Sequence, residues 1–408
     1  MKQVKRILFL TDNFPPEVNA PATRTHEHAK VWVEKGYSVT IITCAPNFPH
    51  GKIYNGYSNK IYTKEEQDGI KVIRVMTYIA ANEGFLKRIL DYISFAVMAF
   101  FAGLFVRTDI IVATSPQFFT AVAGRWLSVF KLKPWIMEVR DLWPESIAAV
   151  GAINKGHIYK LLERVELRLY QSAKKIIVVT DSFKEKIVSR GIDTRKIEIH
   201  KNGVILDLFE PRPKDVELMK ANPQFLGKKV FAYIGTHGMA HGLSFILNAL
   251  SKAQKLIPEA HFLFIGEGAE KENLIKQANN LGLTNATFMP FVPKHEVVQY
   301  LSLMDVALVN LKKSDTFKSV IPSKIFEAAS LQKPILLGLE GETQDIIESF
   351  NAGVCFEPEN EKEFLAQCQA ILKEKSYQTY QTGCQALAKA FDRKKIALQV
   401  LETITTDK

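Results

Sequence analysis

The sequence predicts an α/β protein made of two Rossmann-like domains that face a central cleft. Its 408 residues exceed what one hydrophobic core normally serves, so two domains are expected. In both halves, short apolar segments alternate with helical patterns, which is typical of parallel sheets with helical crossovers. The turn signal Asn202-Gly203-Val204 and the polar, proline-containing stretch Asp207–Asn222 mark the boundary between the halves.

The first half opens with the apolar run Ile7–Leu10, which is too short for a signal-peptide core and predicts a buried strand. A proline-rich loop, Asn13–Ala22, leads to a helix through His26–Glu34 that ends at Gly36. The strands expected in this half are short, apolar and bounded by turn or helix signals, and they are Arg6–Thr11, Tyr37–Thr43, Gly69–Met76, Asp109–Thr114, Pro134–Val139, Lys175–Val179 and Lys196–His200.

The second half repeats the plan, with a helical pattern after each apolar segment. Its expected strands are Lys229–Ile234, His261–Ile265, Ala286–Met289, Asp305–Leu311 and Pro334–Leu337. The last helical pattern runs from about Tyr377 to Thr403 and is broken around Phe391-Asp392. Ligands of such sheets gather at the carboxyl ends of the strands, so the loops there are expected to carry the function.

Composition narrows the class of protein. With 47% apolar and 24% charged residues, the chain fits a soluble globular protein. No D-x-D pair occurs, so no carboxylate-bound magnesium is expected. The cysteines have no paired C-x-x-C spacing, which predicts neither a zinc site nor a disulfide framework and fits a reducing cytoplasm. These cysteines are Cys44, Cys355, Cys368 and Cys384.

The net charge of +10 is unevenly distributed. Residues 1–200 hold 29 Lys and Arg against 19 Asp and Glu, whereas residues 201–408 hold 24 of each. The whole excess of positive charge therefore lies in the first half. This asymmetry indicates an anionic partner for the N-terminal domain, which could be a membrane surface, a nucleic acid or a phosphorylated substrate.

The stretch Ser319–Pro334 contains a candidate nucleotide site. Pro322 and Ser323 predict a helix start with a capping serine, and such an end presents free N–H groups to an anion. Lys324 adds a full positive charge, and Glu327, one turn on, can accept hydrogen bonds from ribose hydroxyls. The alternative is an ordinary capped amphipathic helix whose Lys and Glu are solvated.

Two loops in the first half are also candidates. Asp12–Arg24 is long for a plain connection, has small residues that would let a ligand approach the backbone, and places Arg24 near a helix start. The second loop, Glu138–Ser146, puts Arg140, Asp141 and Glu145 after a buried strand, where charges must be paired or used. A plain connecting loop in the first case, and a structural Arg140–Asp141 pair in the second, are the alternatives.

A glycine-rich turn follows the first strand of the second half. Gly235, Gly238 and Gly242 are spaced three and four residues apart, which is not the dinucleotide fingerprint but permits close approach of a phosphate. His237 or His241 could donate a hydrogen bond to that phosphate. A second glycine pair, in Gly266-Glu267-Gly268 after the next strand, strengthens the prediction of a phosphate site.

The segment Phe85–Arg107 indicates a membrane contact. Its stretch Ile93–Phe105 has no charged residue and is flanked by Lys87, Arg88 and Arg107. This apolar stretch is too short to span a bilayer, which needs about 20 residues. Aromatic and basic flanks suit a helix lying in the membrane interface, and a wholly buried core helix is the alternative.

These motifs, in this order, resemble glycosyltransferase family 4, whose members are retaining enzymes of the GT-B fold. Within that family the chain looks like bacterial O-antigen and capsule transferases of the N-acetylfucosamine transferase type. The resemblance covers essentially the whole chain and is most specific at the last two of its motifs. The motifs are Pro15-Pro16-Glu17, Pro46-Asn47-Phe48-Pro49-His50-Gly51, Ser115-Pro116, Asn202-Gly203-Val204, Arg140-Asp141-Leu142-Trp143-Pro144-Glu145-Ser146 and Pro322-Ser323-Lys324-Ile325-Phe326-Glu327.

The resemblance implies an acceptor-binding domain over residues 1–205 and a nucleotide-sugar-binding domain over 206–387, with a C-terminal helix, 388–408, crossing back to the first. The implied donor-binding residues are Gly235, Thr236, Gly238, Met239, His241, Glu267, Val292, Ser319, Pro322, Ser323, Lys324 and Glu327. The implied acceptor-binding residues are Glu17, Asn19, Ala20, Arg24, Arg140, Asp141 and Glu145.

The chain departs from the family pattern at three of these positions. Ser319 replaces the first glutamate of a Glu-seven-residues-Glu motif, while Glu327 matches the second, which binds ribose. Thr236 and His241 stand where an Arg and a Lys usually bind the diphosphate. Lys324 is therefore expected to carry more of the diphosphate charge.

The resemblance further implies a metal-independent transfer of a sugar, expected to be N-acetylated, from a UDP-sugar to a polyprenyl-diphosphate-linked saccharide. The implied catalytic groups are Asp141, His241, Lys324 and Glu327, and the backbone around Phe291–Pro293 is expected to read the base. A cytoplasmic protein held peripherally at the membrane is expected. The alternatives are a nucleotide-sugar epimerase of the same fold and a basic, anion-binding non-enzyme such as a nucleic-acid-binding protein.

Overall fold

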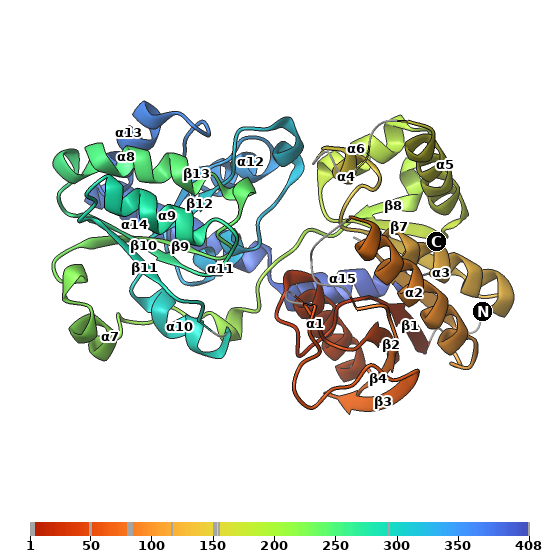
Figure 1. Cartoon of the computed structure of the whole chain (residues 1–408). Helices are drawn as coiled ribbons and strands as arrows, with labels where there is room; N and C mark the ends of the chain where they lie inside the picture. The colour runs from red at the N-terminus through yellow and green to blue at the C-terminus, as the bar shows by residue number, and fades with distance from the viewer. Residues whose placement is uncertain are drawn as a thin grey trace. The chain divides into compact units, whose positions relative to one another are not determined.

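The computed structural model describes residues 5–48, 51–79, 85–115, 117–149, 153, 156–292 and 294–406. The chain forms two compact units (Figure 1). Residues 1–202 and 393–408 make the N-terminal unit, and residues 203–392 make the C-terminal unit. The domain limits expected from the sequence, at 205/206 and 387/388, fall a few residues from these boundaries.

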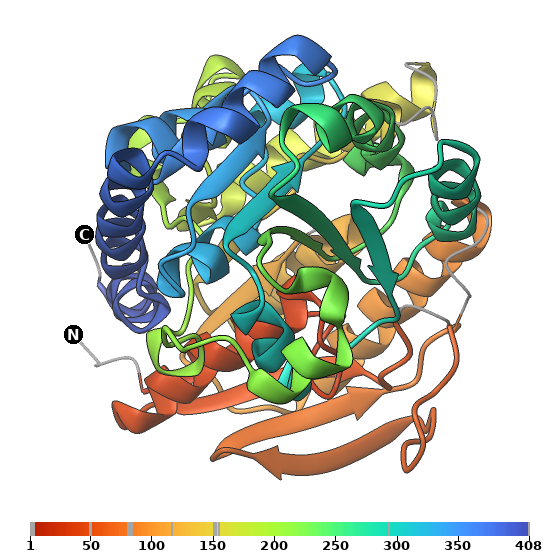
Figure 2. The same ribbon diagram turned by 90° about the vertical axis from the view of Figure 1, so that its left-hand side faces the viewer.

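The N-terminal unit is built on an eight-stranded sheet of order β3-β4-β2-β1-β5-β6-β7-β8. Every neighbouring pair is parallel except β3 and β4, which form an antiparallel pair at one edge (Figure 2). Parallel strands need helical crossovers, which explains the alternation seen in the sequence. The strands are β1 (Arg6–Leu10), β2 (Ser38–Cys44), β3 (Tyr62–Gln67), β4 (Ile70–Val75), β5 (Ile110–Thr114), β6 (Trp135–Val139), β7 (Lys175–Val178) and β8 (Ile197–Ile199).

Helices cover both faces of this sheet. One face packs against α2, α3, α5 and α6 in a single hydrophobic core, and the other carries α1 and α15, where Phe9 of the sheet meets Trp32 of α1. The indole of Trp32 also donates to the carbonyl of Ala397 at 2.7 Å, which ties α15 to α1. The helices are α1 (Ala20–Glu34), α2 (Phe85–Leu104), α3 (Phe118–Lys131), α4 (Glu145–Ala149), α5 (His157–Ser172), α6 (Asp181–Ser189) and α15 (Arg393–Thr405).

The C-terminal unit is built on a six-stranded, wholly parallel sheet of order β11-β10-β9-β12-β13-β14. Its strands are β9 (Lys229–Ile234), β10 (Ala260–Ile265), β11 (Ala286–Met289), β12 (Val306–Asn310), β13 (Ile335–Gly338) and β14 (Gly353–Cys355). Its helices are α7 (Val216–Ala221), α8 (Leu243–Leu256), α9 (Lys271–Asn280), α10 (Lys294–Ser302), α11 (Lys324–Ser330), α12 (Glu342–Phe350), α13 (Glu361–Ile371) and α14 (Glu374–Ala390).

The prediction of two α/β domains with parallel sheets is confirmed, and the break in the last helix falls at Phe391-Asp392 as expected, between α14 and α15. Two strands were missed. β3 alternates polar residues on an exposed edge, and β14 has only three residues, so neither has an apolar run. The helix expected from His26 begins earlier, at Ala20, because the side chain of Asn19 caps it by accepting from the Ala22 N–H.

Helix α2 contains the apolar segment for which a membrane contact was expected. Its buried face packs on the sheet through Phe95 and Ala99, whereas Val97 and Phe101 are exposed. The helix is thus apolar on both its buried and its exposed side. In the described part of the chain, no helix combines the length and apolarity needed to cross a membrane.

Candidate functional site

The C-terminal unit gathers a cation and a glycine-rich turn at the end of β9. Lys324, the first residue of α11, places its Nζ 4.1 Å from the centroid of the Tyr233 ring. A Cβ built on Gly235 would lie only 2.8 Å from that Nζ. The ammonium group therefore rests directly against the backbone where β9 ends, which is where a parallel sheet binds its ligands.

The environment of Lys324 suits an anion. Lys324 is half-buried as a residue, and burial of its ammonium lowers the pKa to about 8, although the Glu327 carboxylate opposes this shift. Glu327 lies one turn further along α11 and is half-buried too. Among the described residues, Lys324 forms no ion pair. A desolvated cation without an ion-pair partner is costly, and a bound anion would remove that cost.

The glycines of the site are required by close backbone packing. Gly235 and Gly266 both have φ near +147°, a conformation that other residues rarely adopt. A Cβ on Gly266 would lie 1.9 Å from the carbonyl oxygen of Gly235, and one on Gly268 would lie 2.4 Å from that of His237. The loops after β9 and β10 therefore pack backbone to backbone. Gly238, by contrast, could hold a Cβ in ordinary contact.

Two histidines in the same turn are neutral. Burial, with a contribution from the charge of Lys324, lowers the pKa of His237 and the pKa of His241 to about 4. Neither ring nitrogen of His237 finds a hydrogen-bond partner among the described residues. The carbonyl of His241 accepts from the Asn310 amide at 2.8 Å, which fixes the turn to the end of β12. His241 can thus donate a hydrogen bond but does not supply a charge.

The remaining expected donor residues lie around this turn with varied roles. Thr236 is exposed, and its carbonyl accepts from the Tyr233 hydroxyl at 2.7 Å. The Glu267 carboxylate accepts from Lys271 at 2.6 Å and from the N–H of Phe291 at 3.3 Å. Met239 is exposed and Val292 is buried in the core. The structure therefore gives Glu267 a part in holding the loop after β11.

The start of α11 differs from the expected capped helix. Ser323 has helical backbone angles (φ −58°, ψ −26°) and its side chain makes no capping hydrogen bond, because a capping residue needs an extended backbone. The hydroxyl of Ser319 donates to the carbonyl of Thr316 at 3.3 Å, within the 3-10 helix Asp315–Ser319. Pro322 is half-buried just before the helix. The capping prediction for Ser323 was wrong.

In the N-terminal unit, the loop after β1 is anchored by carboxylates. Glu17 is buried and accepts from the N–H groups of Asn47 and Phe48 at 2.8 and 2.9 Å. Burial raises the pKa of Asp91, on α2, to about 7, and it also raises the pKa of Asp12; repulsion from Glu17 adds to both shifts. This cluster can therefore donate as well as accept hydrogen bonds near neutral pH. The other two residues expected in this loop, Asn19 and Ala20, form the cap and the first residue of α1.

Arg24 is placed differently from the expectation. Its side chain is 1% exposed, its Nε lies 3.2 Å from the Glu138 carboxylate, and its other nitrogens donate to the carbonyls of His200 and Lys201. Arg24 thus joins α1 to β6 and to the segment that follows β8, so it is not presented to a ligand in this structure. The partner, Glu138, comes from a distant part of the chain.

Arg140 remains a candidate for binding an anion. Its Nη1 is buried and has no hydrogen-bond partner among the described residues. Burial lowers the pKa of Arg140 to about 10, with Glu138 opposing the shift and Arg24 adding to it. Among the described interactions, Arg140 and Asp141 form no ion pair, so the alternative of a structural pair is not supported.

Asp141 and Glu145 follow Arg140 in the same loop. The Asp141 carboxylate accepts from the Ser146 hydroxyl at 3.0 Å, and burial raises its pKa. Glu145 is exposed and pairs with Lys186 at 2.8 Å. The hydroxyl of Ser115, at the end of β5, accepts from the N–H groups of Arg140 and Asp141, which fixes the loop between two strand ends.

Several groups were not found by sequence reasoning. Tyr233 reads as an ordinary core residue of β9, Asn310 as the end of β12, and Asp91 as a lone charge in an apolar helix. Only the placement of Tyr233 beneath Lys324 shows its part in the site. Three residues of the family motifs, Pro49, His50 and Pro116, lie outside the described residues. Pro293 of the expected base-reading segment does too, so that segment is described only up to Val292.

Comparison with known proteins identifies the class of protein. A family model described as "Glycosyl transferase 4-like domain" matches residues 19–203, and one described as "Glycosyl transferases group 1" matches residues 215–383. Together with the two α/β units, these matches define a glycosyltransferase of the GT-B fold. More specifically, the chain belongs to glycosyltransferase family 4, as its motifs indicated. Both matches favour sugar transfer over the epimerase alternative.

Two curated relatives agree with this assignment. The putative colanic acid biosynthesis glycosyl transferase WcaI of Escherichia coli (strain K12) is 25% identical over 373 residues, which are 88% of this chain and 90% of that protein. The probable glycosyltransferase WbjE of Pseudomonas aeruginosa is 28% identical over 222 residues, or 54% of this chain and 55% of that protein.

Solved structures share the fold. Anabaena HepE in complex with UDP has a TM-score of 0.73 at 17% identity, covering 98% of this chain and 99% of that one. Sucrose-phosphate synthase from Thermosynechococcus elongatus has a TM-score of 0.74 at 15% identity, covering 98% of each chain. At these identities the likeness concerns the fold alone.

Proposed function

We propose that this glycosyltransferase transfers a sugar from a UDP-sugar, with retention of configuration, to a lipid-linked saccharide in the biosynthesis of a bacterial surface polysaccharide such as O-antigen or capsule. The observation that carries the proposal is the desolvated ammonium of Lys324 against the backbone of Gly235, with no ion-pair partner in the described part of the chain. The assignment of WcaI to colanic acid biosynthesis and the UDP bound to HepE support the substrate classes. From the family resemblance we further propose that the transferred sugar is N-acetylated and that the enzyme works at the cytoplasmic membrane surface.

On the donor side, the residues around β9 would stabilise the leaving nucleotide. The diphosphate gains charge as the glycosidic bond breaks, and a positioned cation stabilises that charge. Lys324 supplies the cation, His241 a neutral hydrogen-bond donor, and Glu327 an acceptor for the ribose hydroxyls. The acceptor hydroxyl attacks from the face the nucleotide leaves, and its proton passes to the departing phosphate.

On the acceptor side, we propose that the loops of the N-terminal unit bind the saccharide. Arg140 has a buried nitrogen, without a hydrogen-bond partner among the residues that the structure describes, for a phosphate or a sugar hydroxyl. Asp141 and Glu17 hold the loops that would order the sugar. Arg24 is a positioning residue, because its ion pair holds Glu138 beside Arg140. We propose that the diphosphate charge is met by side chains, so that no metal is required.

A nucleotide-release assay tests the proposed function. The protein is offered a panel of UDP- and GDP-sugars, with and without a polyprenyl-diphosphate saccharide, in the presence of EDTA. We expect release from a UDP-sugar that depends on the acceptor and is unaffected by EDTA. Acceptor-independent conversion of the donor sugar would instead indicate an epimerase, and loss of activity in EDTA would refute the metal-independent mechanism.

The pH dependence of kcat/KM is expected to follow Lys324. Its protonated form carries the charge that attracts a diphosphate, so kcat/KM should fall as pH rises through about 8, where the free enzyme loses that proton. A pH–rate profile of kcat/KM for the nucleotide-sugar checks this. If kcat/KM fell only near pH 10.5, the ordinary pKa of lysine, this would contradict the placement of Lys324 in the site.

A further inference from the structure

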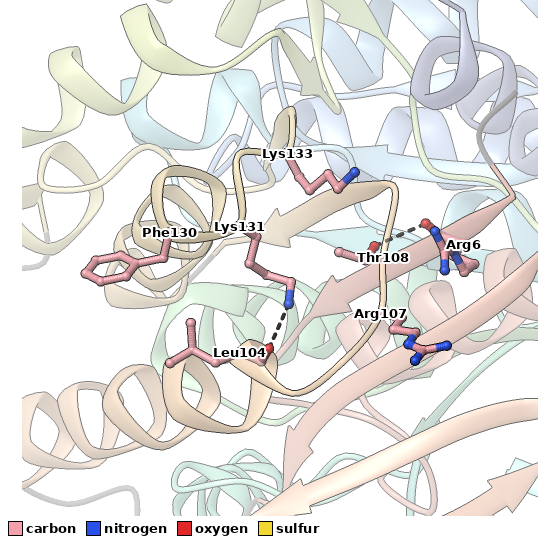
Figure 3. Close-up of a pocket in the computed structure, with 7 residues that line it drawn as sticks. All are labelled: Arg6, Leu104, Arg107, Thr108, Phe130, Lys131 and Lys133. Carbon is pink, nitrogen blue, oxygen red and sulfur yellow. Dashed lines mark hydrogen bonds between the residues drawn. The ribbon is translucent and has the colours of Figure 1, made fainter. Parts of the chain in front are cut away.

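An open pocket lies in the N-terminal unit away from the loops described above. It has a volume of about 380 Å³ and is lined by Arg6, Arg107, Lys131 and Lys133, with Phe130 at its rim (Figure 3). Arg6 begins β1, and Arg107 lies between α2 and β5. Lys131 ends α3, and Lys133 lies between α3 and β6. These are the amino ends of the strands, opposite to the carboxyl ends where the candidate site lies.

The pocket has an excess of positive charge. Among the described residues, the one carboxylate bonded to its cations is Asp109, which pairs with Arg6 at 2.6 Å. The ammonium of Lys131 donates to the carbonyl of Leu104 at 2.8 Å, and burial together with the charge of Lys133 lowers its pKa. In the same described part of the chain, Arg107 and Lys133 form no ion pair. Four cations around one carboxylate favour an anion.

Exposed aromatic side chains adjoin this pocket. Phe101 of α2 is 55% exposed, Phe130 of α3 is 64% exposed and Phe105 is 87% exposed. Phe101 and Phe130 both contact the ring of Phe100, at 5.4 Å between centroids, and Phe130 also lies 6.4 Å from Trp126. Figure 3 shows the Phe130 ring pointing away from the lysines that follow it. Phe100, Phe101, Trp126 and Phe130 thus form one aromatic cluster, which adjoins the cations through Phe130.

The apolar surface continues along α2. Leu90, Ile93, Val97 and Phe101 are exposed at spacings of three and four residues, which places them in one stripe along the helix. A contiguous exposed apolar surface of this kind marks an interaction site. The combination of aromatic and aliphatic side chains with neighbouring Lys and Arg matches a surface that enters the membrane interface and meets anionic headgroups.

We propose that the exposed stripe of α2, the aromatic end of α3 and the basic pocket together form a docking face for an anionic lipid bilayer, with a lipid phosphate in the pocket. Charge complementarity selects this occupant, because the cations adjoin the apolar surface. The proposed lipid-linked acceptor gives this face a role, since it would hold the enzyme at the membrane that contains the acceptor. The evidence for the docking face comes from the residues that form it, and it does not depend on the identity of the acceptor.

Vesicle co-sedimentation of the full chain tests the proposal. Wild-type protein is expected to bind vesicles of phosphatidylcholine with phosphatidylglycerol more tightly than vesicles of phosphatidylcholine alone. The double variant Arg107→Gln with Lys133→Gln should bind the anionic vesicles about 30-fold more weakly, since each cation near such a surface contributes about 1 kcal/mol. The variant Phe101→Gln with Phe130→Gln should weaken binding to both kinds of vesicle.

A matched control removes two charges from the opposite face of the sheet. Lys30→Gln with Lys35→Gln, on and after α1, should bind vesicles as the wild type does. Nucleotide release measured with a detergent-soluble acceptor should be unchanged in the pocket variant, which separates failure of docking from failure of the proposed function. Equal vesicle binding by the pocket variant and the wild type would overturn the proposal. Self-association of the protein through the docking face, without binding to vesicles, would also overturn it.

Discussion

Replacing Lys324 with alanine is expected to lower the rate of nucleotide release by about 10²–10³-fold, the loss typical of removing one group that stabilises a developing negative charge. Its ammonium lies against Gly235 and Tyr233, so the variant removes a full charge from the point where β9 ends. The loss should appear mainly in kcat, because the diphosphate gains charge in the transition state. Steady-state kinetics of nucleotide release measures it.

The matched control for this variant is Lys313→Ala. Lys313 is an exposed lysine of the same unit, and its ammonium pairs with Glu357 on the surface. Its removal should leave the rate within about twofold, since exposed ion pairs contribute little. A rate for Lys324→Ala as high as that of the control would show that Lys324 does not bind the diphosphate.

The second large effect is expected from Gly235→Ala. The added Cβ would lie 2.8 Å from the Lys324 ammonium, and the positive φ adds strain of about 1–3 kcal/mol. A lysine side chain can move away, so the protein should fold with Lys324 displaced and should lose about 10–100-fold in the rate of nucleotide release. Kinetics and thermal unfolding of the same preparation measure the two effects.

Two other glycines separate displacement from strain. Gly282 also has a positive φ, but a Cβ there meets nothing within 4 Å, so Gly282→Ala should be strained and remain active. At Gly266 the Cβ would lie 1.9 Å from a backbone oxygen, so Gly266→Ala should lower the unfolding temperature far more than Gly235→Ala does. If Gly235→Ala kept the activity of Gly282→Ala, the contact between Gly235 and Lys324 would have no functional part.

Several features of the proposed donor side are visible in the local sequence. Glycines at positive φ, the proline before α11 and the charge of Lys324 are features of single turns, and each is visible in a few consecutive residues. Tyr233 was not predictable, because an aromatic residue in a buried strand looks the same whether it lies under a cation or inside the core. The role of Tyr233 depends on the packing that brings Lys324 of α11 over its ring.

The proposed acceptor side depends more strongly on contacts between distant parts of the chain. In the sequence Arg24 lies near a predicted helix start, but Glu138, more than a hundred residues away in the chain, pairs with it inside the unit. Asp91 reads as an isolated charge, but α2 brings it to the Glu17 and Asp12 carboxylates. Such pairings depend on the order of strands in the sheet, which local patterns do not contain.

A crystal structure of the protein with bound UDP would show directly whether Lys324 binds the diphosphate. We expect a diphosphate oxygen within about 2.7–2.9 Å of the Lys324 Nζ, the distance of a charge-assisted hydrogen bond, with the ribose hydroxyls at Glu327. UDP bound with its diphosphate away from Lys324 and Gly235 would contradict the proposed donor site.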